Sequence, residues 1–233
     1  APCLMAGNVI VMKPSRVTMQ SGIEIEKAFM ESGIPDGIFQ TVVGSVDSAN
    51  HLIDSDVNAV TFTGSTNAGA KVGERAARHL KKCVLELGGS DPFIVLDDAI
   101  IDKAAEGAVK GRFINCGQSC VASKRFFVGK NIAKDFIELF IKKASQLKIG
   151  DPMNMETDLG PISSKDGFET ISGIVEDAKE KGAEILLGGS KIEGKGFFYE
   201  PTILTNVKPN MRIANEETFG PVAPITIVEN ESE

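Results

Sequence analysis

The sequence predicts an α/β protein in which a doubly wound parallel sheet is followed by a second α/β domain. Short apolar runs alternate with amphipathic stretches of helical length, a pattern typical of parallel strands joined by crossover helices. The alternation restarts after Gly88-Gly89, which is therefore the best candidate for a domain boundary. With 42% apolar and 24% charged residues, the 233-residue chain can bury a substantial core.

The first part of the chain is expected to contain four strands separated by three helices. Pro14 ends the first strand because proline cannot donate to a β-ladder, and Gly33 with Pro35 ends the first helix. The expected strands are residues 9–12, 38–43, 58–62 and 83–87. The expected helices are residues 19–32, 47–53 and 67–80.

After the glycine pair, the same reasoning predicts strands at residues 93–96, 126–128, 184–187 and 223–228. Three helices are expected: one that begins at about residue 102, a second that reaches residue 147, and a third over residues 165–181. Asn131 is a candidate N-cap for the second of these helices. Its apolar face includes Phe136 and Phe140, and we expect part of that face to be exposed.

Composition excludes several classes of function. The net charge of −7 argues against broad attraction to nucleic acid or an anionic membrane, and no apolar run reaches the length of a membrane span. The start of the chain lacks the layout of a signal peptide. Four cysteines, Cys3, Cys83, Cys116 and Cys120, match neither a disulfide framework nor a zinc ribbon. Reduced thiols in a cytoplasmic protein without a metal site are the expectation.

The strongest chemical signal is Cys120, which follows Gly117-Gln118. A thiol after a glycine turn can attack a carbonyl, and the N–H of Cys120 can serve an oxyanion. We expect Cys120 to lie beside a helix N-terminus, where a thiolate is favoured. The alternative is a structural cysteine buried near a helix start.

Glu86 is the second signal, a single carboxylate between Leu85 and Leu87. A half-buried carboxylate in this setting is suited to take a proton from water. The alternative is an edge carboxylate paired with a lysine such as Lys81. A thiol and an isolated carboxylate together are what acyl chemistry through a thioester requires.

Several motifs in order along the chain resemble the aldehyde dehydrogenase superfamily. They are Gly7-Asn-Val-Ile-Val-Met-Lys-Pro-Ser15, Phe62-Thr-Gly-Ser-Thr66, Leu85-Glu-Leu-Gly-Gly89, Phe113-x-Asn-x-Gly-Gln-x-Cys120 and Glu216-Glu-Thr-Phe-Gly-Pro-Val222. Residues 86–96 and the short loop after Gly44 are most similar to succinate-semialdehyde dehydrogenases. The resemblance implies a Rossmann-like cofactor-binding domain over residues 1–87 and a catalytic domain over residues 88–233, both incomplete.

The resemblance also implies roles for individual residues. Cys120 would be the nucleophile and Glu86 the general base. The cofactor-binding positions would be Lys13 with Ser15 at the adenosine ribose, Gly44 near the adenosine, Gly64 and Ser65 at the pyrophosphate, Leu87 by its carbonyl near the nicotinamide, and Glu217 with Phe219 at the nicotinamide ribose. For Glu217 the alternative is a surface acidic pair, and for Phe219 it is a core aromatic ring.

One position departs from the pattern of many NAD-preferring relatives. They carry glutamate directly after Lys-Pro-Ser, where this chain has Arg16. A guanidinium cannot accept bonds from a ribose 2′-OH but can pair with a 2′-phosphate. The expected cofactor is therefore NADP or NAD, with NADP favoured; the alternative is a solvated arginine at a helix start.

Members of the family are much longer, so the chain resembles the middle of an aldehyde dehydrogenase without either end. We therefore expect it to lack one oxyanion donor, and we expect a homo-oligomer only for the complete enzyme. The implied activity is oxidation of a small aldehyde, succinate semialdehyde for preference, through a thiohemiacetal and a thioester. The alternatives are a catalytically inactive fold module and an acylating dehydrogenase that uses coenzyme A.

Overall fold

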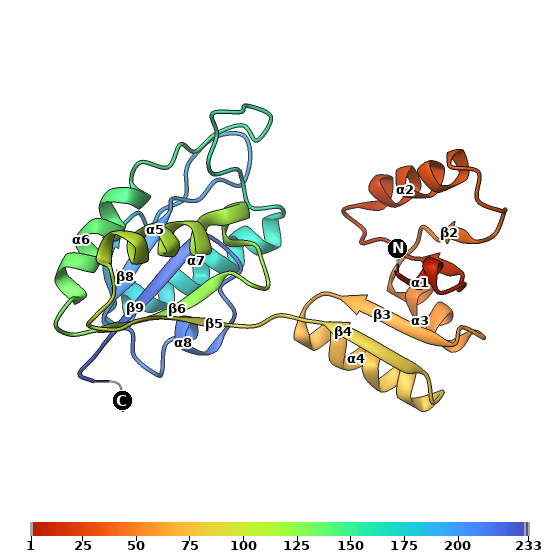
Figure 1. Ribbon diagram of the computed structural model, residues 1–233, viewed down its shortest axis with the longest axis horizontal. Helices are drawn as coiled ribbons and strands as arrows, with labels where there is room; N and C mark the ends of the chain where they lie inside the picture. Colours follow the sequence, from red (N-terminus) through yellow and green to blue (C-terminus); the bar gives the residue numbers. More distant parts are fainter. Residues whose placement is uncertain (1, 231, 233) are drawn as a thin grey trace. The chain divides into compact units, whose positions relative to one another are not determined.

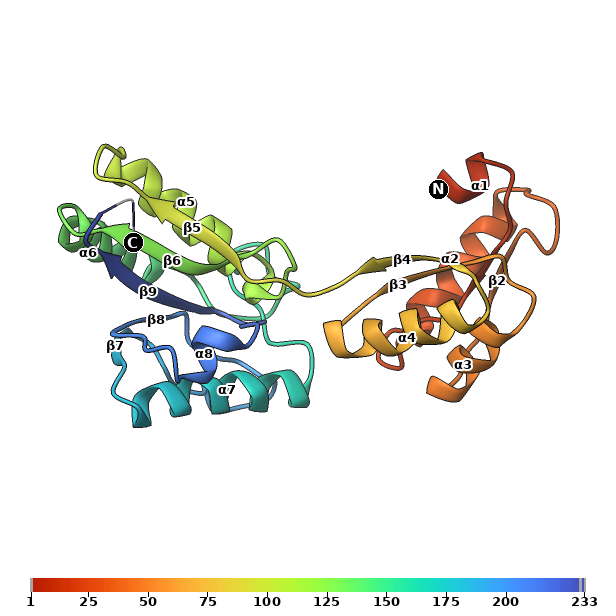
Figure 2. The ribbon, with the colours of Figure 1, turned by 90° about the horizontal axis from the view of Figure 1, so that it is seen from below.

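The computed structural model describes residues 2–230 and 232 (Figures 1 and 2). The chain forms two compact units; the first ends at Leu87 and the second begins at Gly88. The assignment of a cofactor-binding role to the first unit and a catalytic role to the second stays a prediction.

The first unit contains two separate pairs of parallel strands. Strand β1 (Ile10–Met12) pairs with β2 (Phe39–Thr41), and β3 (Ala59–Thr63) pairs with β4 (Lys82–Glu86). The helices are α1 (Pro2–Met5), α2 (Met19–Glu31), α3 (Val46–Asp54) and α4 (Thr66–Arg78). The alternation of strand and helix is thus as predicted. The strands of this unit form two separate pairs and not one continuous sheet.

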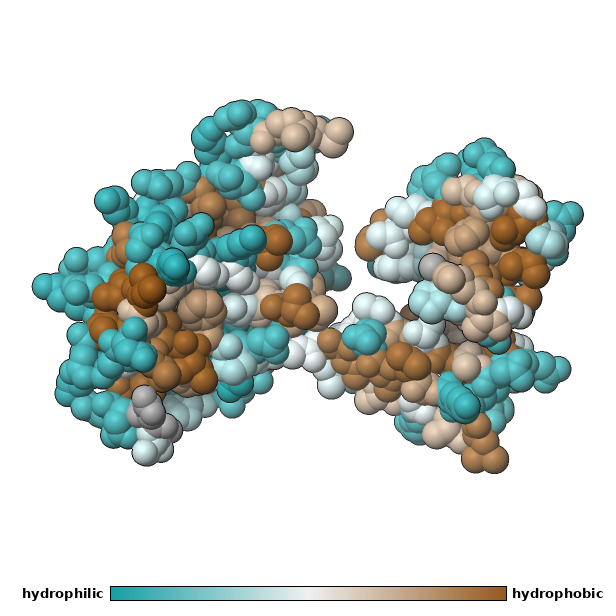
Figure 3. All heavy atoms as spheres, in the orientation of Figure 1, coloured by the Kyte–Doolittle hydropathy of each residue, from teal (hydrophilic) through white to brown (hydrophobic). Residues whose placement is uncertain are grey.

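Close packing in the first unit depends on glycine at particular positions. A Cβ atom at Gly22 would lie 2.8 Å from Cγ of Pro14, so only glycine lets α2 approach the end of β1 this closely. Phe29 of α2 stacks on Phe39 of β2 with ring centroids 4.5 Å apart. Apolar side chains nevertheless reach the surface of this unit, among them Val84 (58% exposed) and Leu80 (96%). Figure 3 shows hydrophobic atoms on the visible face of both units.

The second unit is built on a five-stranded sheet in the order β5-β6-β9-β8-β7. All neighbouring strands are parallel except β7 and β8, so the predicted α/β class is confirmed. The strands are β5 (Asp91–Val95), β6 (Ser123–Gly129), β7 (Glu184–Leu187), β8 (Thr202–Thr205) and β9 (Val222–Val228). The helices are α5 (Ile101–Phe113), a single turn η1 (Ile114–Gly117), α6 (Ala133–Ala144), α7 (Lys165–Glu180) and α8 (Arg212–Asn215).

Helices α5 and α6 pack over β5 and β6 (Figure 2). Phe126 of β6 lies 5.4 Å from Phe140 of α6, centroid to centroid, and Phe136 lies 5.6 Å from Phe140. Phe136 and Phe140 are fully buried. The expectation that their face is exposed is therefore wrong, because this face meets the sheet and α5 within the same unit.

Serine caps begin three of the longer helices. The side chain of Ser65 accepts a hydrogen bond from Ala68 N–H at 3.3 Å, and Ser164 accepts one from Gly167 N–H at 3.1 Å. Ser45 caps α3 in the same way. Asn131, in contrast, does not cap α6: its amide donates to Asp97 Oδ2 at 2.5 Å, and the helix begins at Ala133 without a side-chain cap.

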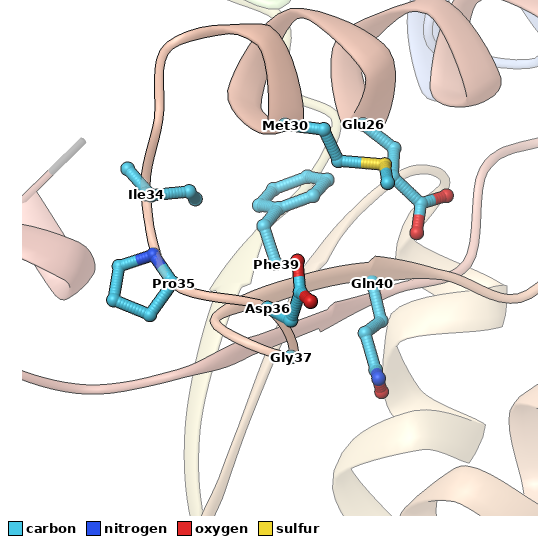
Figure 4. A pocket seen from close by; sticks show the side chains of 8 residues that line it. All are labelled: Glu26, Met30, Ile34, Pro35, Asp36, Gly37, Phe39 and Gln40. Carbon is cyan, nitrogen blue, oxygen red and sulfur yellow. The ribbon is translucent and has the colours of Figure 1, made fainter.

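A pocket of about 220 Å³ lies in the first unit between α2 and the loop that leads into β2 (Figure 4). Its lining residues are Glu26, Met30, Ile34, Pro35, Asp36, Gly37, Phe39 and Gln40. No predicted site residue is among them. In the part of the chain that the structure describes, no helix has the length and apolar character that a membrane crossing requires.

Candidate active site

Cys120 lies in an exposed turn between η1 and β6. No helix begins next to Cys120 along the chain: α5 ends at Phe113, and after η1 the chain passes through the turn into β6. That Cys120 lies beside a helix N-terminus stays a prediction. The alternative of a buried structural cysteine is excluded by the exposure. Among the described residues, the Cys120 N–H makes no hydrogen bond, which leaves this amide available to an oxyanion.

The turn before Cys120 has a strained backbone. Asn115 and Cys116 have φ values of 51° and 55°, in the left-handed region that costs most side chains about 1 kcal/mol or more. Gly117 continues this conformation with φ 68°. A Cβ atom there would overlap the carbonyl oxygen of Gly220 and a nitrogen of Arg112, so only glycine fits. Strained turns of this kind cluster at functional sites.

Gln118 fastens the turn to the loop before α7. Its Oε1 accepts a hydrogen bond from Ser163 N–H at 2.8 Å, and its amide donates to the carbonyl of Pro161 at 3.4 Å. Asn115 donates to the Gln118 carbonyl at 2.9 Å. The Gly-Gln pair therefore has a structural task, which is to hold the loop that presents Cys120.

Arg112, at the end of α5, is the first of two buried cations beneath the turn. Its Nη2 donates to the carbonyls of Gly117 (2.7 Å), Gly220 (2.7 Å) and Thr218 (3.1 Å), and its Nη1 donates to that of Ser123 (2.9 Å). Burial lowers the pKa of Arg112 to about 10, which leaves it charged at neutral pH. Arg112 therefore joins the turn to the segment that carries Glu217 and Phe219.

Burial also acts on Cys116, the neighbour of this guanidinium. It raises the pKa of the Cys116 thiol to about 12, and the charge of Arg112 offsets only part of the effect. Cys116 is thus an inert thiol at neutral pH, in contrast to the exposed Cys120.

Lys124 of β6 is the second buried cation. Its Nζ donates to the Cys120 carbonyl at 2.8 Å and forms an ion pair with Glu217 Oε1 at 3.1 Å. The same Glu217 oxygen accepts a hydrogen bond from Gly89 N–H at 3.3 Å. A Cβ atom at Gly88 would overlap the other oxygen of this carboxylate. Cys120, Lys124, Glu217 and the glycine pair are therefore one connected group within the second unit.

The two glutamates of the Glu216-Glu217 pair have different surroundings. Glu216 lies at the surface in an ion pair with Arg212 at 2.7 Å, whereas the Glu217 side chain is 28% exposed and faces the buried Lys124. A surface acidic pair therefore does not describe Glu217. Phe219 is 43% exposed and so is not a core aromatic ring.

Glu86 ends β4 in the first unit, where its side chain is exposed. The expectation of a half-buried carboxylate is wrong for this unit, because β4 pairs with β3 alone and Leu85 beside it is itself 36% exposed. Its alternative, an ion pair with Lys81, is not found either: Lys81 donates to the carbonyls of Ile53 and Ser55. The Glu86 carbonyl accepts a hydrogen bond from Gly64 N–H at 3.0 Å.

The other predicted cofactor positions lie in the first unit. Ser65 is the N-cap of α4, but Gly64 beside it has already donated its N–H to Glu86, so that amide is not free for a phosphate. Leu87 packs against α4 at Gly69, where a Cβ atom would overlap its side chain. Of the remaining positions, Lys13 donates to the carbonyl of Pro14 (2.5 Å), Gly44 lies against Ser48, and Ser15 and Arg16 are exposed in the turn before α2.

Sequence reasoning missed Arg112 and Lys124, although each had a detectable signal. Arg112 follows Ala105 and Ala108 on the helical face that is buried in α5, so burial was readable from the spacing. Lys124 alternates with Phe126 and Val128, which a strand places on the same buried face. A basic residue on a predicted core face needs hydrogen-bond acceptors or a carboxylate inside the protein. Buried charges of this kind are frequent at functional sites.

This combination of an α/β fold with a thiol turn tied to a glutamate agrees with a known family. The family model described as "Aldehyde dehydrogenase family" matches residues 1–233, and the chain belongs to this family.

Among curated proteins, the chain is 45% identical over 230 residues to succinate semialdehyde dehydrogenase [NAD(P)+] Sad of Escherichia coli K12, covering 98% of this chain and 50% of that protein. It is 42% identical to succinate-semialdehyde dehydrogenase [NADP(+)] of Deinococcus radiodurans, covering 100% and 49%. Among solved structures, 3,6-anhydro-L-galactose dehydrogenase in complex with NAP matches with a TM-score of 0.95 at 38% identity, covering 98% and 49%. The chain thus spans about half the length of the relatives it matches.

Proposed function

We propose that the chain carries the reactive groups of an NAD(P)-dependent aldehyde oxidation, with Cys120 as nucleophile and Glu86 as general base. The observation that carries the proposal is the Cys120 turn. An exposed thiol lies on a strained turn that two buried cations, Arg112 and Lys124, hold by its carbonyls. Membership of the aldehyde dehydrogenase family supports the reaction class.

The residues present fit a nicotinamide cofactor. Oε1 of Glu217 is held by Lys124 and Gly89, while Oε2 makes no hydrogen bond with any described residue and can accept from a ribose diol. The exposed ring of Phe219 lies two residues further on and offers an apolar surface. We assign both to the nicotinamide ribose. Positions in the first unit would hold the rest of the cofactor. Lys13, Ser15, Arg16 and Gly44 would meet the adenosine and its ribose, and Leu87 would offer its carbonyl to the nicotinamide. Ser65 would meet the pyrophosphate, with Gly64 lining the same loop while its N–H bonds to the Glu86 carbonyl.

The chemistry then follows from the chain's own groups. The Cys120 thiolate attacks the aldehyde carbon to form a thiohemiacetal, whose oxygen accepts a hydrogen bond from the free Cys120 N–H. When bound, the nicotinamide cofactor supplies the acceptor for the hydride that leaves this carbon. The acyl group remains on Cys120 as a thioester. Glu86 takes a proton from the water that attacks the thioester carbon; the C–S bond breaks, the carboxylic acid leaves, and the proton on Glu86 returns to the Cys120 sulfur.

For the substrate and cofactor we propose succinate semialdehyde and NADP, with NAD as the second cofactor. Two relatives that are 42% and 45% identical carry succinate-semialdehyde dehydrogenase names with NADP or NAD(P). Arg16 favours NADP because it is exposed, forms no ion pair with any described residue, and can pair with a 2′-phosphate. A homo-oligomer in the cytoplasm is the corresponding proposal for the whole protein.

The first test is selective alkylation. Brief treatment of the folded chain with iodoacetamide, followed by peptide mapping, should label Cys120 ahead of the buried Cys116 and the half-buried Cys83, and faster than the exposed Cys3. Exposure alone predicts equal rates for Cys3 and Cys120, so their ratio is the informative quantity. A rate for Cys120 no higher than that for Cys3 would argue against an activated thiol.

The second test is turnover. Succinate semialdehyde and NADP are added to the chain and formation of the reduced cofactor is followed by absorbance, with Cys120→Ser as baseline. In a complete enzyme that contains this segment, Glu86→Gln should give a burst of about one equivalent and then stall, because Gln cannot take the proton of water. Steady turnover of Glu86→Gln at the normal rate would remove Glu86 from this role. Absence of any burst would favour the inactive module, and a requirement for coenzyme A would favour the acylating alternative.

A further inference from the structure

Lys124 lies outside all of the motifs, and no step of the proposed reaction passes through its ammonium group. Its side chain is fully buried, yet its ammonium reaches two different parts of the second unit. One is the main-chain carbonyl of Cys120 at 2.8 Å; the other is Oε1 of Glu217 at 3.1 Å. A buried ammonium is expensive unless it is paired, and here both partners belong to the candidate site.

The local backbone explains how Lys124 comes to point there. In the register of β5 and β6, Asp91 pairs with Ser123 and Pro92 pairs with Arg125, so the pairing shifts at Lys124. Pro92 has no N–H to donate to the ladder at this point. The direction of the Lys124 side chain follows from strand alternation, which places it with Phe126 and Val128 on the buried face.

We propose that Lys124 is a positioning residue that couples the Cys120 turn to the Glu217 carboxylate. It anchors the turn by the carbonyl of the reactive cysteine, and it balances the charge of a carboxylate that is only 28% exposed. The proposal rests on the proposed function for the importance of Cys120 and Glu217, while the coupling itself is a property of the second unit alone.

The coupling predicts that loss of Lys124 and loss of Glu217 change the reactivity of Cys120 in opposite directions. Lys124→Met leaves the Glu217 carboxylate unpaired beside the Cys120 turn, and a negative charge there disfavours the thiolate that attacks an alkylating agent. Glu217→Gln leaves the Lys124 ammonium unbalanced beside the same turn and favours that thiolate. If Lys124 only packed the strand, loss of either partner would change the reactivity of Cys120 in the same direction.

The experiment measures the alkylation rate of Cys120 by neutral iodoacetamide at fixed pH, relative to the exposed Cys3 in the same sample. Lys124→Met should be slower and Glu217→Gln faster, each by at least about threefold, which corresponds to the usual coupling of a contacting charge pair. The double variant should return to within about twofold of the native rate. Lys124→Arg keeps the charge and should stay closer to the native rate than Lys124→Met.

The matched control is Lys130→Met. Lys130 follows the same strand but forms an exposed ion pair with Glu229 at 2.9 Å, so its loss should leave the Cys120 rate unchanged. Persistent protection of the buried Cys116 in each variant would show that the second unit is still folded.

The outcomes separate the two proposals. If Cys120 of the native chain is alkylated no faster than Cys3, the proposed function fails at its nucleophile. If Cys120 is selectively labelled but both single variants change its rate in the same direction, or not at all, the proposed function stands and the coupling is refuted. If Cys116 becomes reactive in Lys124→Met, that variant is unfolded and only Glu217→Gln tests the coupling. In that case, a Cys120 alkylation rate in Glu217→Gln that is not higher than the native rate refutes the coupling.

Discussion

Arg112 offers the sharpest test of how the candidate site is held together. Arg112→Met keeps a long apolar stem but removes the guanidinium that donates to four main-chain carbonyls. Three of these bonds, to Gly117, Thr218 and Gly220, are buried, so their acceptors cannot turn to water without local unfolding.

The magnitude follows from these contacts. The Gly220 carbonyl also accepts a hydrogen bond from Val222 N–H at 2.8 Å, so the variant leaves two buried carbonyls, those of Gly117 and Thr218, without a donor among the described residues. Each costs about 1–3 kcal/mol, so the two together cost roughly 2–6 kcal/mol. The variant also removes the cost of burying a cation, which offsets part of this loss. We expect a net destabilisation of about 2–4 kcal/mol, a large share of the stability of a domain.

The assay can be confined to the second unit. The chain has one tyrosine and no tryptophan, and the tyrosine, Tyr199, is buried in this unit. Tyrosine fluorescence during urea unfolding should show a midpoint lowered by roughly 1–2 M for Arg112→Met, taking about 2 kcal/mol per M as the urea dependence. Arg112→Lys keeps a charge but not the planar fork of the guanidinium, so its urea midpoint should lie between those of the native chain and Arg112→Met.

A matched control is Arg125→Met. Arg125 is exposed on the same strand as Lys124 and donates to one carbonyl, that of Ser90 at 2.8 Å. We expect its loss to cost at most about 1 kcal/mol. If Arg112→Met shifts the midpoint no more than Arg125→Met does, the carbonyls around Gly117 do not depend on the guanidinium, and the account of the turn is wrong.

Three further predictions concern other parts of the chain. Arg16→Glu should move the ratio of catalytic efficiencies from NADP towards NAD, because a carboxylate repels a 2′-phosphate and accepts from a 2′-OH; an unchanged ratio would show that Arg16 does not meet the ribose. Hydrogen bonds from Arg75 lower the pKa of Asp54 to about 2, so this pair contributes stability above the unfolded value of 3.8 that is lost as the pH falls through 2. Asp54→Asn should abolish that part of the acid transition seen by circular dichroism. The pKa of Cys116, raised from 9.0 to about 12, means that stability falls as the pH rises from 9 towards 12, and Cys116→Ala should flatten the alkaline limb of urea midpoints against pH.

Much of the architecture could be predicted from local signals. Alternating apolar runs and amphipathic helices indicated the α/β class, and the strand at Glu184–Leu187 was predicted with its observed bounds. Serine caps, glycine turns and proline act through contacts within a few residues, so they are readable along the chain. The motif around Cys120 was visible for the same reason, since the Gly-Gln turn and the thiol are neighbours.

Local signals failed where long-range packing decides the surroundings of a side chain. The face of Phe136 and Phe140 is covered by the sheet, and Asn131 pairs with Asp97, 34 residues away, instead of capping its helix. The spacing of apolar residues shows which face of a helix they share, but it does not show which other element covers that face.

The residues of the site were thus largely determined by the sequence, and their connections by the tertiary structure. Motifs alone gave Cys120 and Glu217 as candidates, but not the buried ammonium of Lys124 that joins them. The bond from Arg112 to Thr218 spans 106 positions, and that from Gly89 to Glu217 spans 128. The physical reason is that a buried charge is stable only where distant segments bring acceptors to it, and no local pattern encodes that meeting.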